Sequence, residues 1–312
     1  MANVIEIILD LAYAVLIIYL GVLSGIIFTR IPQLKKHQEN FISIILNLFT
    51  PLIITIAILS IQTDQNRSID WILPVVAALI VTILGIVGPK FIASLFNQPP
   101  PDPAELCNST FPNAVNFPFP IILAFAFKEG LAIASIFLAV TVVLRNSLGF
   151  WISGYKISKE SVKTVIRFPP NWGIFVGFIL LFTLDEGTYT PITEHPFTNI
   201  YFQIGIFGTL MTLGFSMKKP SWDYKIPIIR VGITRFVFSG IALVILLVVF
   251  SPPAFVAIPI IVQMIAPPAV YNGIYAAKFK LDTELTSQII VGLTLIALIF
   301  LPLELFILRA LY

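Results

Sequence analysis

Two proline-rich stretches, FPNAVNFPFP at residues 111–120 and APPAVYNGIYAAKF at residues 266–279, interrupt long apolar runs in opposite halves of the chain. Proline removes a backbone donor and clashes with the preceding turn, which costs about 3 kcal/mol or more inside a helix. Lipid cannot satisfy the carbonyls and amides that a break frees, so such backbone must face protein or a water-filled cavity. The two stretches therefore predict interrupted membrane helices that surround a polar site.

The predicted helix-breaking residues fall at corresponding positions in the two halves. They are Pro112, Pro118, Pro120, Pro267, Pro268 and Gly273. A lone membrane proline usually means a simple kink, but matched interruptions in two halves are the best sequence pointer to a central transporter site. Half-helices that begin near the midplane present free N–H groups and positive dipole ends, so the pattern favours an anion as ligand.

The composition is that of a membrane protein. Of the 312 residues, 58% are hydrophobic and 11% are charged, and the mean hydropathy of +0.97 lies outside the range of soluble domains. Cys107 stands alone and no Cys or His cluster has metal-site spacing, so neither a metal nor another cofactor is expected. Lysine and arginine lie mostly between apolar runs, where lipid headgroups and topology explain them, and they do not indicate a nucleic-acid partner.

Apolar runs of about 20 residues predict ten transmembrane helices. Their approximate limits are 4–29, 38–61, 71–96, 106–127, 130–154, 164–184, 198–217, 226–250, 253–277 and 284–309. The basic connection 155–163 separates the first five helices (residues 1–154) from the last five (residues 164–312). Because five is odd, a second copy of the unit enters the membrane from the other face. The predicted fold is an all-α polytopic membrane protein with two inverted five-helix repeats, in which broken helices 4 and 9 cross.

The distribution of basic residues predicts the orientation. Alternate connections contain 14 of the 19 Lys and Arg residues: Arg30, Lys35, Lys36, Lys90, Lys156, Lys159, Lys163, Arg167, Lys218, Lys219, Lys225, Arg230, Lys278 and Lys280. The opposite set has only Arg67, Lys128 and Arg309. Basic loops resist translocation, so both termini are expected on the extracytoplasmic side of the cell membrane.

At the two proline-rich stretches the chain resembles the auxin efflux carrier family. That family's fourth span has a stretch like L-P-N-T-L-V-M-G-I-P, which places Pro112, Asn113 and Pro120 in register, whereas Pro118 stands where the family usually has glycine. Pro268 and the AAKFKLD stretch that follows match the family's ninth span. The resemblance implies two inverted repeats, elevator-type movement, frequently a homodimer, and organic-anion substrates such as indole acetate or dicarboxylates.

Asn113 is the first candidate for substrate binding. It matches the binding asparagine of the family, and its amide offers donors and an acceptor to a carboxylate; alternatively it caps the half-helix that follows. Asn116 and Asn272 either contact substrate or satisfy freed carbonyls. Gln263 and Tyr271 are weaker candidates, and an aromatic ring in this context is more often packing than a clamp.

Arg145 and Arg235 are the two basic residues well inside apolar runs. Charge inside a membrane costs about 2.5–3.5 kcal/mol on insertion scales, so such residues usually face the protein interior or mark a pathway. Arg145 either attracts an anionic substrate or snorkels toward the cytoplasmic surface. For Arg235 we expect a side chain that snorkels toward the cytoplasmic surface.

The sequence predicts a transporter that carries a small organic anion without a coupled cation. Neither break contains Asp or Glu, whereas antiporters of the related fold keep carboxylates at the crossover. A sodium- or proton-coupled symporter of the same fold is the alternative. An enzyme would need a catalytic constellation that the sequence lacks, and a channel would need a filter or rings of charge.

Overall fold

The computed structural model describes residues 4–60, 68–152, 154, 163, 166–167, 169–217, 219 and 221–311. The first half consists of α1 (Val4–Arg30), α2 (Pro32–Lys35), α3 (Gln38–Ile44), a π-helical turn η1 (Ile45–Phe49), α4 (Thr50–Leu59), α5 (Ser68–Leu95), α6 (Pro103–Thr110) and α7 (Pro118–Ile152). Most of the predicted connection 155–163 lies outside the described residues.

The second half is also helical. It consists of α9 (Pro169–Thr183), α10 (Glu186–Thr193), α11 (Pro196–Phe215), η2 (Trp222–Tyr224), α12 (Lys225–Gly232), the π-helical segment η3 (Ile233–Phe238), α13 (Ser239–Phe250), α14 (Ala254–Met264), α15 (Tyr271–Lys278) and α16 (Thr283–Leu311). Within the described ranges no strand is present beyond one isolated bridge.

Several helices have the length and composition of membrane spans. Among the described residues, five segments are long and apolar enough to cross a bilayer: Gln38–Leu59, Asp70–Leu95, Glu129–Gly149, Lys225–Phe250 and Thr283–Leu311. Large apolar side chains face outward, as at Phe182, Val248 and Ile299, which are 78%, 73% and 71% exposed. Lipid satisfies such surfaces, and the protein is therefore an all-helical, multi-pass membrane protein.

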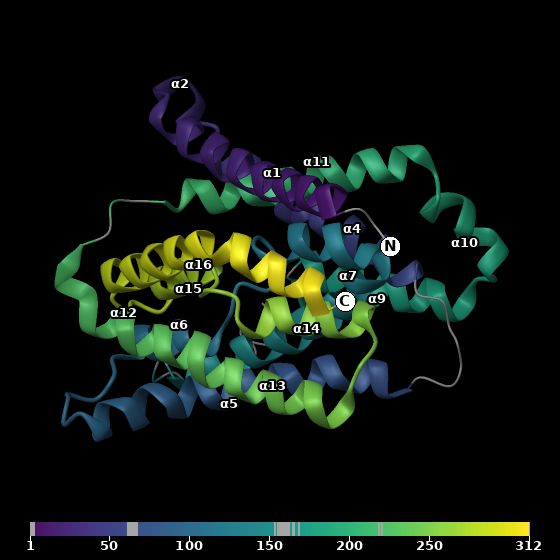
Figure 1. Ribbon diagram of the computed structural model, residues 1–312. Coiled ribbons are helices and arrows are strands. Elements are labelled where there is room, and N and C mark those ends of the chain that lie inside the picture. Colours follow the sequence, from purple (N-terminus) through teal and green to yellow (C-terminus); the bar gives the residue numbers. More distant parts are fainter. Residues whose placement is uncertain are drawn as a thin grey trace.

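The two termini lie at the same end of the helix bundle (Figure 1). Helix α2, the connection α5–α6 and the start of α12 lie at the opposite end in the same view. Lys35 at the end of α2 and Lys225 at the start of α12 belong to the basic set of residues that predicted the orientation. We call this end of the bundle the basic end.

Glycines set the contact between two helix pairs. Gly25 of α1 and Gly214 of α11 approach so closely that a Cβ at either would lie 2.1 Å from a carbonyl oxygen of the other helix. Gly173 of α9 lies in the same way against α4. The signal is visible in the sequence as Gly21 with Gly25 and Gly173 with Gly177, each four residues apart, a spacing that lets membrane helices approach closely.

We expect Gly214→Ala to destabilise the protein by about 1–3 kcal/mol, because the new Cβ forces α1 and α11 apart. Gly240→Ala in α13 is the matched control, since a Cβ there meets no atom within 4 Å and alanine favours a helix by about 1 kcal/mol. Thermal unfolding of the purified variants measures the difference. Equal melting temperatures for the two variants would contradict the close contact.

Helix α7 is sharply bent, although its backbone is helical from Pro118 to Ile152. The amide nitrogen of Gln263 donates to the carbonyls of both Ala114 and Ala134, each at 3.0 Å, so these two residues lie close together. A straight helix would place residue 134 about 24 Å from the start of α7. Helix α7 is therefore bent between Pro118 and Ala134.

The non-helical connection predicted between residues 127 and 130 is absent. Glu129 and Gly130 lie in helical backbone, because a single glycine costs a helix only about 1 kcal/mol and does not end it.

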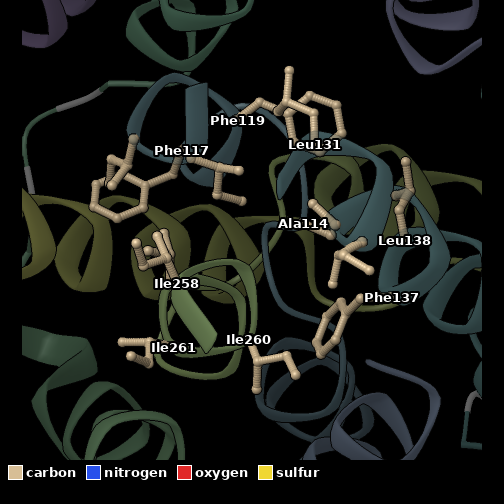
Figure 2. Packing of buried hydrophobic residues seen from close by; sticks show 14 of the residues in the cluster. Ala114, Phe117, Phe119, Leu131, Phe137, Leu138, Ile258, Ile260 and Ile261 are labelled. Carbon is tan, nitrogen blue, oxygen red and sulfur yellow. The ribbon is translucent and has the colours of Figure 1, made fainter. Parts of the chain in front are cut away.

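The core lies where α14 packs against residues 111–117 and α7. Figure 2 shows Ile258, Ile260 and Ile261 of α14 among Phe117 and Phe137. All five side chains are buried. The apolar packing fixes the place at which the two interrupted segments meet.

Candidate functional site

The first interruption separates α6 from α7. Asp102 caps α6 by accepting a hydrogen bond from the amide of Ala104 at 2.7 Å. The helix ends at Thr110, and Phe111 is extended, as expected for a residue that precedes a proline. Seven residues, 111–117, then lie outside the helices.

The second interruption separates α14 from α15. Helix α14 ends at Met264 and α15 begins at Tyr271, which leaves residues 265–270 non-helical. Pro267 and Pro268 lie within this segment, where proline disfavours helical continuation. We refer to residues 111–117 and 265–270 as the first and second break.

Three of the predicted helix-breaking residues have a different place. Pro118 and Pro120 lie in the first turn of α7, where proline is tolerated because the first amides have no helical partner. Gly273 is the third residue of α15, so it does not interrupt that helix. A Cβ at this position would meet no atom within 4 Å, so no neighbouring atom requires a residue without a side chain here.

The two breaks run antiparallel and pair through their backbones. Pro112 lies opposite Pro268. The amide of Asn113 donates to the carbonyl of Pro267 at 2.7 Å, and the amide of Ala269 donates to the carbonyl of Phe111 at 3.1 Å. These bonds satisfy groups that a broken membrane helix would otherwise leave exposed.

Gln263 and Asn272 satisfy freed carbonyls of the first half. The amide nitrogen of Gln263 bonds two carbonyls, as described for α7, and that of Asn272 donates to the carbonyl of Phe111 at 3.1 Å and to Oδ1 of Asn108 at 3.3 Å. Both side chains are buried. Their contacts match the alternative in which these side chains bond backbone carbonyls. The substrate contact predicted for them stays a prediction.

The snorkelling expected of Arg235 is wrong. Its side chain is fully buried, at 0% exposure. The guanidinium donates to the carbonyl of Ala266 through Nε and Nη2, at 3.1 and 2.7 Å, and to that of Met264 at 2.9 Å. The carbonyls at the end of α14 attract the positive charge inward, because they form the negative end of the helix dipole.

A cavity of about 620 Å³ lies against the two breaks. Four of the six predicted substrate-binding residues line it: Asn113, Asn116, Arg145 and Tyr271. Gly273 lines it as well, whereas Gln263 and Asn272 are absent from its lining. Its volume lies in the range of about 300–1,000 Å³ that is usual for small-molecule sites.

Asn113 has one satisfied and one unsatisfied end. Its Oδ1 accepts a hydrogen bond from the amide of Asn116 at 3.0 Å, so the side chain orders the approach to α7. Its Nδ2 is buried and has no hydrogen-bond partner. Capping and ligand binding are therefore compatible in Asn113, because each uses a different atom of the amide.

Arg145 is a buried cation held between two aromatic rings. Its Cζ lies 5.5 Å from the ring centre of Phe111 and 5.4 Å from that of Tyr271, within the range of cation–π attraction. Its Nε is buried without a hydrogen-bond partner. In the described part of the chain the ion pair found is Arg230 with Glu105, so no described carboxylate neutralises Arg145.

The other walls of the cavity contain polar residues that the sequence did not indicate. They are Gln38, Thr50, Thr212, Ser216, Thr283 and Ser287. Single polar residues near the ends of long apolar runs are common, so nothing local distinguishes these six. Only the folded arrangement of α3, α4, α11 and α16 brings them to one cavity.

Interrupted, paired membrane helices beside a mainly apolar cavity with a few polar groups are the arrangement of a helical membrane transporter. The family model for membrane transport proteins matches residues 4–165, just over half of the chain. The chain therefore belongs to this family, that of the auxin efflux carriers, whose members are transporters and not enzymes. A search of curated proteins finds no match.

Proposed function

We propose that the protein is a secondary transporter that moves a small organic anion by elevator-type alternating access, as an uncoupled exporter. The observation that carries the proposal is the pair of unsatisfied donors in the cavity, Nδ2 of Asn113 and Nε of Arg145. Buried donors without partners are costly, and an anion bound in the cavity would accept a hydrogen bond from each of them.

The lining suits an anion with an apolar body. Ile42, Leu46, Leu138 and Ile290 line the cavity together with the polar groups. Hydrophobic side chains with a few placed polar groups are typical of sites that orient a small molecule. A carboxylate at Arg145 with its hydrocarbon or aromatic part against the apolar wall fits this distribution.

The cavity reaches the basic end of the bundle. Its lining includes Gln38 at the start of α3, Ser216 directly after α11 and Thr283 at the start of α16. These residues adjoin the connections that contain Lys36, Lys219 and other members of the basic set. If that end is cytoplasmic, the structure represents an inward-open state, with both termini extracytoplasmic in the cell membrane.

The packing of the helices supports two inverted repeats. Spans 1 and 6 of the sequence analysis correspond to α1 and α9, and spans 2 and 7 to α3–α4 and α11. The glycine contacts join α1 to α11 and α9 to α4, so each first span of one repeat packs on the second span of the other. We assign these four spans to a fixed frame, against which the helices with the crossing breaks move. We also propose that two copies of the protein form a homodimer through this frame.

Export without a coupled cation follows from the charges of the cavity. No Asp or Glu is among its described lining residues. A membrane potential acts on one charge by about 2.3 kcal/mol per 100 mV, and a negative interior drives an anion outward. A sodium- or proton-coupled symporter of the same fold is the alternative that the following experiment separates.

The test is current on a solid-supported membrane with proteoliposomes, challenged with indole acetate, malate and malonate. We expect a substrate-dependent current that is unchanged when the sodium or proton gradient is removed. Asn113→Ala should lower it about tenfold, since one hydrogen bond to a charged group is worth about 1.5–3 kcal/mol. A current that requires sodium or a proton gradient would establish the symporter instead, and silence with every anion would reject the substrate class.

A further inference from the structure

Arg235 is a cation in a place where membrane transporters bind ions. It lies on the π-helical segment η3, and such segments are frequent at functional sites. Its guanidinium makes three hydrogen bonds to two carbonyls, those of Met264 and Ala266. Both carbonyls belong to the end of α14 and the second break.

Carbonyls of this kind are the usual ligands of coupling cations. In transporters with broken helices, unwound backbone carbonyls and the C-terminal ends of half-helices coordinate Na⁺. The carbonyls of Met264 and Ala266 are two such oxygens, and both accept from one guanidinium. The second break thus has the oxygen donors of a cation site, and the positive charge there is a side chain of the protein.

We propose that the guanidinium of Arg235 is a tethered cation, which takes the place of a soluble coupling cation at the second break. The inference deepens the proposed function and rests on it, because only a carrier has a coupling ion to replace. It also names the reason for uncoupled transport: a cation that is part of the chain moves with the protein, is never released, and cannot transmit an ion gradient.

The contacts distinguish this role from an ordinary buried ion pair. Among the described residues no carboxylate pairs with Arg235, whereas Arg230, five residues earlier, bonds Glu105 at 2.8 Å. The charge of Arg235 is balanced by carbonyl dipoles alone, as that of a bound Na⁺ would be. Removal of the guanidinium should therefore leave a cluster of carbonyls that a small monovalent cation can occupy.

The test is the thermal stability of the purified full-length protein in NaCl against choline chloride at equal ionic strength. The wild type should melt at the same temperature in both salts. Arg235→Ala should melt lower in choline and regain about 5 °C or more in NaCl, with saturation, as expected for a ligand that binds the folded state. Guanidinium chloride at low millimolar concentration should rescue Arg235→Ala in the same way, and Arg235→Lys should stay insensitive to sodium.

Arg309→Met is the matched control, since Arg309 is exposed at the end of α16 and its removal should create no response to sodium. If Arg235→Ala cannot be purified in choline, Arg235→Gln, which keeps a donor without the charge, takes its place. A folded Ala or Gln variant that ignores sodium, or a wild type that sodium stabilises selectively, would overturn the proposal. The assay needs no substrate, so its outcome is separate from any failure to detect anion current.

Discussion

Arg145→Met should lower the anion-dependent current by a factor of about 10 to 100 at subsaturating substrate, and Asn113→Ala added to it should abolish the remainder. Arg145 brings the positive charge of the cavity, and a charge-assisted hydrogen bond is worth about 1.5–3 kcal/mol. Methionine keeps most of the length of the side chain and packs against Phe111 and Tyr271 as the guanidinium does. The loss therefore reports on charge rather than on packing.

The control for Arg145→Met is Arg309→Met, at an exposed position that does not line the cavity and lies 19 residues after Ile290, the nearest lining residue in the sequence. Arg145→Lys keeps the charge and should retain part of the current, although an ammonium lacks the planar face that stacks between two rings. Concentration series of each variant separate the apparent affinity from the maximal current. Unchanged affinity for the anion in Arg145→Met would exclude this residue from the binding site.

Glu105→Ala should destabilise the protein by about 3–5 kcal/mol, the largest stability effect that we expect of a single substitution. The carboxylate of Glu105 in α6 is 1% exposed and bonds Arg230 of α12 at 2.8 Å. Arg230 also donates to the carbonyl of Pro99 at 2.7 Å. Removing the carboxylate leaves a buried cation without a counter-charge, which costs far more than the pair itself contributes.

Melting temperatures of Glu105→Ala, Arg230→Met and the double variant measure this effect. The double variant should be more stable than Glu105→Ala alone, because residues in one ion pair are not additive and the unpaired charge is gone. Additive losses in the double variant would contradict the buried pair. The pair ties the half-helix before the first break to α12, so its loss should also weaken transport.

The sequence predicted the two breaks because proline has a strong local effect. Pro112, Pro267 and Pro268 lie in the non-helical segments, and the helices end within a few residues of them. Pro118 and Pro120 were harder to interpret, since the same residue that ends a helix is also favoured at the start of one. Whether such a proline ends a helix or begins one depends on where the chain resumes its helix. That position depends on packing against α14.

The candidate site was predictable for residues whose chemistry is unusual in a membrane. Asn113 and Arg145 line the cavity, and an amide in a break or a charge in an apolar run is visible in one sequence. Gln263 and Asn272 have the same chemistry but face carbonyls of the other half. No local pattern separates a side chain that satisfies a distant carbonyl from one that faces a cavity, because the partner lies more than 100 residues away.

Arg235 shows the same limit for charge. Its position in an apolar run indicated an exceptional residue, and the length of an arginine side chain made a path to the surface plausible. The side chain instead points to the carbonyls of Met264 and Ala266, which lie 29 and 31 residues further along the chain. Long-range contacts of this kind determine the direction of a long side chain.

Alternating access at the cavity is tested most directly by the accessibility of one introduced cysteine. Val115→Cys lies on the first break and lines the cavity, and Cys107→Ala removes the native thiol, which is buried. In oriented proteoliposomes, a membrane-impermeant maleimide is added to one face at a time, with and without an anion that gives current. We predict labelling from the basic end without substrate, slower labelling there with substrate, and new labelling from the other end under transport; labelling from both faces at equal rates regardless of substrate would contradict a carrier.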